Sequence, residues 1–268
     1  MKIKDNILII RIFPITLIAV MLLFSTSSCK KEKDKENETG KITLTFTFSV
    51  DNETLQTDTM AYTNAAGNIY EVNEVKFFIS DIIFIDKNNN RIIITDNNSI
   101  HYIDNNIPST LTWKIKDNLA AGEYKALEFR FGLKDEKNKT YTFLNPPESN
   151  MAWPEVLGGG YHYMMINGKW LKSGSATPFN FHLGRGQLYN GENITGFIDN
   201  SFIVTVSNSP FSINSQETVL NLDMNINNWF CGPEIYDFDI IGGAIMTNQT
   251  AQEMARANGH NVFSINKK

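Results

Sequence analysis

Hydrophobic and polar residues alternate along much of this chain, most regularly in residues 42–50. One side of that segment is apolar and the other carries hydroxyl groups, with Ile42, Leu44, Phe46, Phe48 and Val50 set against Thr43, Thr45, Thr47 and Ser49. A period of two predicts a strand with one buried face. Residues 202–206 and 219–226 are also predicted strands, and the second of these alternates in the same way.

A longer apolar run covers residues 69–86 and predicts buried strand structure, interrupted near Ser80-Asp81. A hairpin loop is expected at residues 87–90, because asparagine tolerates positive φ. Shorter strands are predicted at 91–95, 101–104, 111–115 and 127–131. Only residues 248–258 predict a helix, with Asn248 as the N-cap and Gly259 just past the end.

Many short strands separated by turns predict a mainly β fold. We expect an antiparallel β-sandwich, immunoglobulin-like or related, with one short C-terminal helix. No linker or internal repeat divides residues 41–268, so these residues are expected to form a single domain.

The N-terminus has the pattern of an export signal. Three basic residues precede an apolar run at 15–24 that is too short to span a membrane comfortably. Small residues then lead into Cys29, as in the lipobox of a bacterial lipoprotein. We expect a signal peptide at 1–28, a lipidated Cys29 that anchors the protein to the membrane, and a charged tether through residue 40. An ordinary secretory signal with an incidental cysteine is the alternative.

These features predict a cell-envelope protein, an outer-membrane lipoprotein on the periplasmic side or at the cell surface. Without residues 1–28 the chain carries 21 Lys+Arg against 28 Asp+Glu, a formal charge of −7. An acidic domain repels phosphate backbones, which argues against nucleic acid as a partner. No catalytic triad, phosphate loop or dinucleotide fingerprint is present, so we expect a binding protein rather than an enzyme.

Metal-ligand chemistry is concentrated in residues 151–186, which hold two of the four histidines, two of the four tryptophans and three of the nine methionines. Strand alternation places His162 and Met164 on one face of their segment, and His182 on a face with Asn180. If the two segments pair as a hairpin, both imidazoles can point into one space. Imidazole and thioether groups suit copper, particularly Cu(I).

The same residues also allow other hypotheses. His101, on a predicted strand, is a third candidate ligand, and Trp153 and Tyr161 are candidates for the wall of the site. The histidines can also be half-buried groups bonded to backbone carbonyls. Exposed aromatic rings would instead favour a surface protein that binds a glycan or other polymer, through Trp153, Tyr161, Tyr163 and Trp170. An accessory subunit of an envelope complex is the third possibility.

A series of short motifs, in order, resembles one known family. The motifs are residues 42–50 (ITLTFTFSV), 62–67 (YTNAAG), 75–80 (VKFFIS), 101–104 (HYID), 121–124 (AGEY), 129–132 (FRFG), Met151-x-Trp153, Gly160-Tyr161 and 181–184 (FHLG). Together they make the chain similar to the MbnP-like family of periplasmic or lipid-anchored proteins associated with copper handling.

The resemblance implies a copper site built on histidine. In some members it also implies a tryptophan oxidised to kynurenine by a dihaem peroxidase-like maturation partner. His182 matches the family's His-Leu-Gly histidine, and Trp153 matches the tryptophan after the methionine. Two more residues separate Trp153 from the Gly-Tyr pair than in the commoner form, and Leu157 lies where a second tryptophan is often found.

Overall fold

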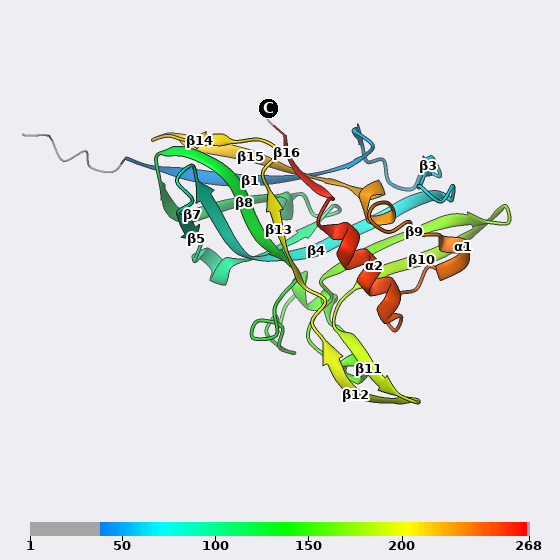
Figure 1. Cartoon of the computed structure of the whole chain (residues 1–268). Coiled ribbons are helices and arrows are strands. Elements are labelled where there is room, and N and C mark those ends of the chain that lie inside the picture. Colours follow the sequence, from blue (N-terminus) through cyan, green and yellow to red (C-terminus); the bar gives the residue numbers. More distant parts are fainter. Residues whose placement is uncertain (1–37, 267–268) are drawn as a thin grey trace, which may run out of the picture. The chain divides into compact units, whose positions relative to one another are not determined.

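The computed structural model describes residues 38–266, and these residues form two packed β-sheets (Figure 1). The first sheet, here called sheet A, has the order β16-β15-β1-β2, with β7 also paired to β1. Its strands are β1 (Thr39–Val50), β2 (Glu53–Thr54), β7 (Thr112–Ala120), β15 (Glu217–Asn225) and β16 (Phe263–Asn266).

The second sheet, sheet B, has the order β10-β9-β4-β8-β13, with four short strands attached to its side. The strands on the main path are β4 (Ile69–Asp86), β8 (Gly122–Phe131), β9 (Met164–Lys172), β10 (Ser175–Leu183) and β13 (Phe202–Val206). The attached strands are β3 (Tyr62–Thr63), β5 (Arg91–Ile93), β6 (Ile100–Asp104) and β14 (Phe211–Ile213).

A separate hairpin of β11 (Gly186–Asn190) and β12 (Asn193–Ile198) projects from the sheets (Figure 1). The helices are α1 (Phe238–Ile241) and α2 (Gln249–Gly259), and the Asn248 side chain caps α2 by accepting from the Ala251 backbone N–H. Five 3₁₀ turns complete the described chain: η1 (Asp96–Ser99), η2 (Pro108–Leu111), η3 (Glu148–Met151), η4 (Glu155–Leu157) and η5 (Ile226–Phe230).

The structure confirms the mainly β fold and the C-terminal helix, and adds two features. The long apolar run is one continuous strand, β4, with a register shift between Ser80 and Ile83 at the expected interruption. Sheet A contains one parallel pair, β1 with β15, within a largely antiparallel fold. The predicted signal peptide, Cys29 and most of the tether lie outside the described residues. No helix among residues 38–266 is long and apolar enough to cross a membrane.

The hydrophobic core lies between the two sheets and defines the inner face of sheet B. Phe77 of β4 points into it, with its ring 6.5 Å from the Phe46 ring of β1 and stacked 5.5 Å from Phe131. Because neighbouring residues of a strand point to opposite faces, Lys76 and Phe78 lie on the outer face of sheet B. Burying aromatic rings in this way contributes the main stabilisation of the sandwich.

The outer face of sheet B is not left to solvent, because the chain between β8 and β9 (residues 132–163) packs across it. Phe143 stacks on Phe78 at 5.3 Å, and Tyr161 packs edge-on against Phe78 at 6.2 Å. We call residues 132–163 the covering segment. It contains Trp153 and His162, so its placement decides where these side chains lie.

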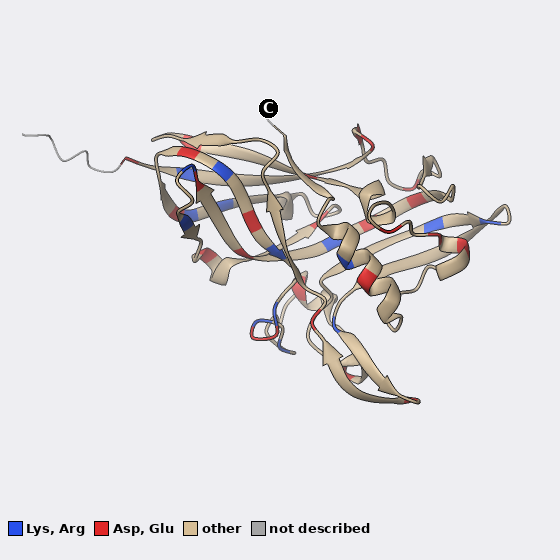
Figure 2. Cartoon of the chain, in the orientation of Figure 1, with Lys and Arg blue, Asp and Glu red and all other residues tan. Residues whose placement is uncertain are grey.

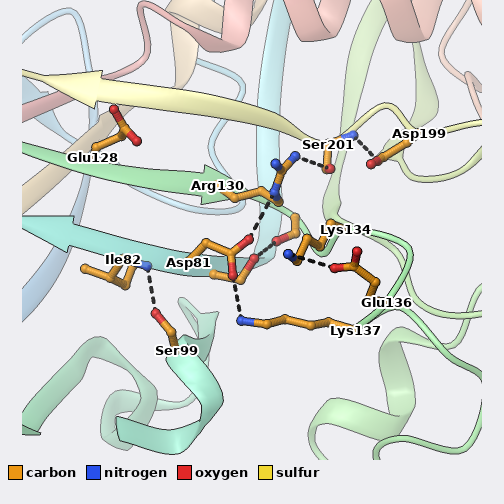
Figure 3. A network of polar contacts seen from close by, with 12 residues as sticks. Asp81, Ile82, Ser99, Glu128, Arg130, Lys134, Glu136, Lys137, Asp199 and Ser201 are labelled. Atoms are coloured by element: carbon orange, nitrogen blue, oxygen red, sulfur yellow. Dashed lines mark hydrogen bonds and ion pairs between the residues drawn. The ribbon is translucent and has the colours of Figure 1, made fainter. Parts of the chain in front are cut away.

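Charged groups fasten the beginning of the covering segment to the sheet (Figure 3). Asp81, at the β4 irregularity, has φ of 52° and accepts from Lys137 Nζ at 2.6 Å and Arg130 Nε at 3.2 Å. Burial opposes ionisation of Asp81, but the two cations outweigh it and hold its pKa below the usual range. Arg185 reaches the same segment through an ion pair with Asp135 at 2.7 Å. Elsewhere Lys and Arg are scattered among Asp and Glu (Figure 2).

Candidate metal centre

His182 is positioned by the β9–β10 hairpin, which the sequence predicts in outline. A two-residue turn joins the strands, with positive φ at both Ser173 and Gly174. The register places His182 opposite Met165, and Met165 opposite Lys76 of β4. Directly paired residues share a face, so the His182 and Met165 side chains lie on the outer face of sheet B.

His162 approaches the same place from the covering segment. Its backbone N–H donates to the Met151 carbonyl at 2.7 Å, which ties the end of the segment to its own earlier turn. The His162 ring lies 5.0 Å from the His182 ring, centre to centre, in a nearly perpendicular orientation. The Trp153 ring packs on the other side, 4.7 Å from His162 and also edge-on. All three side chains are buried.

Hydrogen bonds determine which nitrogen of each imidazole carries its proton. Nδ1 of His162 lies 2.9 Å from the Met151 carbonyl oxygen, which only accepts, so Nδ1 is the protonated atom. Nε2 of His182 lies 2.7 Å from Oδ1 of Asn167, which also only accepts. The opposite nitrogens, Nε2 of His162 and Nδ1 of His182, are therefore bare. Both are buried and have no hydrogen-bond partner among the described residues.

The electrostatics keep both rings neutral. Burial lowers the pKa of His162 to about 4, because the imidazolium form loses its hydration. Burial also lowers the pKa of His182 to about 3, with further contributions from the neighbouring His162 and from Lys76. At neutral pH the site therefore offers two unprotonated nitrogens, one on each of two adjacent rings.

The donor set fits a soft or borderline metal ion with few ligands. Within residues 38–266, no three His, Cys, Asp or Glu side chains gather closely enough to hold a metal. The two imidazoles are thus not part of a carboxylate cage, and Met165 supplies the thioether nearest in register to His182. Imidazole with thioether is a combination that copper accepts, whereas magnesium and calcium require oxygen ligands.

Comparison with known proteins places this chain in a family. The MbnP family model matches residues 39–252, which include sheet B, all of sheet A except β16, and both histidines. The chain belongs to the MbnP family. Among solved structures it is similar to MbnP from Methylosinus trichosporium, with 17% identity, a TM-score of 0.51, and coverage of 75% of this chain and 80% of that chain. That likeness concerns the fold, and no curated protein matches.

Three of the predicted site residues, His101, Met164 and Tyr161, have side chains that lie elsewhere in this MbnP-family chain. His101 pairs with Ile79 and so points toward sheet A, where it is stacked between Phe46 at 5.4 Å and Trp113 at 5.0 Å. Its Nε2 lies 2.8 Å from the Thr110 carbonyl oxygen. Burial lowers the pKa of His101 to about 4. This arrangement describes a half-buried histidine packed between two aromatic rings, separate from the histidine pair.

Met164 is the second correction. It pairs with Leu183 on one side and with Phe77 on the other, so its side chain points into the core between the sheets. Strand alternation alone cannot decide this, because β9 begins only at Met164 and His162 lies outside the strand. Tyr161 is close in sequence but packs on Phe143, 4.9 Å away, and bonds to its backbone.

The residues that the sequence analysis missed are Met165, Asn167 and the Met151 carbonyl. Met165 and Asn167 alternate along β9 on the face that carries His182, and the hairpin register brings both to that histidine. A fixed register for the predicted hairpin would have revealed them. The Met151 carbonyl gives no sequence signal, since any residue supplies a carbonyl.

The aromatic residues considered for glycan stacking are all buried. Trp153, Tyr161, Tyr163 and Trp170 are each no more than 4% exposed. A groove of about 870 Å³ does open beside β1, β15 and β16. Its carboxylate, Asp223, already accepts from Thr47 and Ser49. These observations do not favour the hypothesis that the protein binds a glycan by aromatic stacking.

Proposed function

We propose that this protein binds copper as Cu(I) through Nε2 of His162 and Nδ1 of His182, with the Met165 thioether available beside them. Its role is to sequester copper or deliver it, without catalysing a reaction. Bound copper would supply a Lewis-acidic centre that accepts the two nitrogen lone pairs. The protein supplies a dry pocket and two rings held in fixed orientations.

The observation that carries the proposal is the pair of buried, bare nitrogens. Leaving a buried polar atom without a partner costs about 1–3 kcal/mol, and folded proteins rarely do so twice in one place. Each ring also donates its other N–H to a fixed oxygen, which is the arrangement that orients metal-ligating histidines. Family membership supports copper among the metals that would fit.

The proposal extends to Trp153. Its buried ring touches His162, and its Nε1 donates to the Leu157 carbonyl at 3.1 Å. Conversion to kynurenine, as the resemblance implies, cleaves the C2–C3 bond of the indole, and hydrolysis of the resulting N-formyl group releases C2 as formate, which leaves an aryl ketone and an arylamine. Water supplies the oxygen atoms, and the dihaem peroxidase-like partner removes the four electrons. The mass of the peptide containing Trp153, from protein isolated from its native envelope, tests this step. An unmodified mass would contradict it.

We place the protein in the cell envelope, held there by lipid on Cys29. Metabolic labelling with a fatty-acid analogue tests the anchor, since the label would disappear in Cys29→Ala. Copper met by such a protein lies outside the cytoplasm, where binding removes a reactive ion from the surroundings or holds it for a transporter. Labelling that persists in the variant would refute lipidation at this residue.

Copper retention tests the function itself. The purified protein is loaded with Cu(I), desalted and measured by metal mass spectrometry, beside a His162→Ala/His182→Ala variant and a His260→Ala control. His260 is exposed, so the control removes an imidazole without touching the site. We expect about one copper per chain in the wild type and the control, and none in the double variant with an unchanged circular dichroism spectrum. Equal retention in all three would refute the site.

A further inference from the structure

The outer face of sheet B carries a chain of polar contacts that begins at His182 and leads away from the proposed copper site. Nε2 of His182 meets Oδ1 of Asn167 at 2.7 Å, and Nδ2 of Asn167 donates to Oε2 of Glu74 at 2.8 Å. Glu74 in turn forms an ion pair with Lys76. These residues come from three adjacent strands, β10, β9 and β4.

Glu74, at the far end of this series of contacts, determines the orientation of the Asn167 amide. A carboxylate only accepts hydrogen bonds, so the Asn167 group that faces Glu74 is the amide NH₂. The Asn167 oxygen must then face His182, and Nε2 of His182 must be the protonated nitrogen. A reversed amide would set its oxygen against the carboxylate, which is repulsive, and its NH₂ would then require a bare Nε2 on His182 and a proton on Nδ1.

We propose that Asn167, oriented by Glu74, is a positioning residue that makes Nδ1 of His182 the metal-binding atom. This inference rests on the proposed function and adds to it the residues that select the ligand atom. Without Asn167, an isolated imidazole places its proton on either nitrogen, and only one of the two tautomers offers a lone pair at Nδ1. His162 obtains the same selection from the Met151 carbonyl, with the roles of the two nitrogens exchanged.

The two histidines differ in how easily this selection is removed. A backbone carbonyl stays in place whatever side chain is substituted at Met151, whereas the partner of His182 is a side chain that a substitution can delete. Asn180 provides a matched control, because it pairs with Asn167 in the register and lies on the same face. It is exposed, and its side chain forms no hydrogen bond among the described residues.

Two pairs of variants separate positioning from general packing. Asn167→Leu removes the acceptor for His182, and Asn180→Leu makes the same chemical change one strand away. Glu74→Leu frees the Asn167 amide to rotate. Glu74→Gln loses the ion pair with Lys76 as well but keeps an oxygen that can accept from Asn167. If only packing or charge matters, the two members of each pair behave alike.

The first readout needs no copper. Long-range ¹H–¹⁵N spectra of histidine-labelled protein distinguish protonated from bare ring nitrogens. In the metal-free wild type we expect His182 protonated at Nε2 and His162 protonated at Nδ1. Asn167→Leu and Glu74→Leu should move the proton of His182 partly or wholly to Nδ1, while His162 serves as the internal reference. Asn180→Leu and Glu74→Gln should leave both rings unchanged.

The second readout is Cu(I) affinity, measured by competition with a chromophoric chelator. Loss of a group that orients a metal ligand typically costs about 10–100-fold in affinity, and we expect this for Asn167→Leu and Glu74→Leu but not for their controls. An unchanged His182 tautomer in Asn167→Leu would overturn the inference. A wild type with the expected tautomers but no copper affinity would instead overturn the proposed function, and positioning by Asn167 would then be seen in the spectra alone.

Discussion

A bare buried nitrogen should reduce the stability of the metal-free protein, and His162→Leu tests this directly. The substitution removes the unpartnered Nε2, whose burial costs about 1–3 kcal/mol. It also removes the bond from Nδ1 to the Met151 carbonyl, worth about 1 kcal/mol. That carbonyl remains satisfied, because the backbone N–H of residue 162 still donates to it. The net expectation lies between no change and a gain of about 2 kcal/mol.

His101→Leu is the matched comparison, since it makes the same substitution at a histidine whose ring is hydrogen-bonded and lies outside the proposed site. It removes the donor to the Thr110 carbonyl and the ring stacked between Phe46 and Trp113. We expect a loss of about 1–3 kcal/mol from the unpaired carbonyl and the missing aromatic contacts. In a domain of this size, 1 kcal/mol corresponds to about 2–4 °C in Tm.

The assay is chemical and thermal unfolding of both variants and the wild type in the presence of a copper chelator. A second series contains Cu(I) at about 100 times its Kd, where binding to the folded state alone adds about 2.7 kcal/mol. The wild type should gain that amount and His162→Leu should gain none. If metal-free His162→Leu lost as much stability as His101→Leu, the reasoning that the site holds an uncompensated nitrogen would be refuted.

Three further predictions concern pH, packing and the covering segment. Because folding depresses the pKa of His162, His182 and His101, the unfolded chain takes up protons first and metal-free stability falls as the pH drops below about 6.5, by up to roughly 1.4 kcal/mol per pH unit for each ring. Urea unfolding at pH 7.5, 6 and 5 checks this, and a flat profile would contradict it. In Gly184→Ala the new carbon would lie 2.5 Å from the Trp153 ring. We therefore expect a loss of about 1–3 kcal/mol in the free energy of unfolding and a shifted tryptophan fluorescence spectrum. An unchanged fluorescence spectrum would refute this contact. Asp81→Asn retains a residue that tolerates positive φ but weakens the ion pair to Lys137. Hydrogen exchange in residues 132–163 should therefore become faster, and the free energy of unfolding should fall by about 1 kcal/mol. Exchange at the wild-type rate would show that the ion pair does not hold the segment.

Alternation was sufficient to predict the strands that have one buried face, such as residues 42–50 and 219–226. It could not reveal that these two strands run parallel to each other, since their side-chain pattern is the same in either direction. The hairpin that carries His182 was also predictable, because apolar and polar residues alternate through residues 178–183. The β11–β12 hairpin was not, since it stands apart from both sheets and its alternation reflects no burial in the core.

Within the site, the sequence predicted which histidines to examine but not which atoms they offer. A shift of one residue in register exchanges Met164 for Met165, and only the paired backbone decides between them. The separation of His101 from the pair depends on its pairing with Ile79, across a connection that contains β5 and η1 and does not determine the register. The protonation pattern depends on Asn167 and Glu74, from strands far apart in the chain, so no local motif encodes it.

The most direct test of the central claim is the copper K-edge X-ray absorption of the Cu(I)-loaded protein, compared with the His162→Ala/His182→Ala variant. The proposed site predicts two imidazole nitrogens as nearest neighbours of copper, with the outer scattering that rigid imidazole rings produce, and the absorption edge of Cu(I). The variant should lose this imidazole signature. A wild-type spectrum with only oxygen neighbours, or imidazole scattering that survives in the variant, would contradict the account.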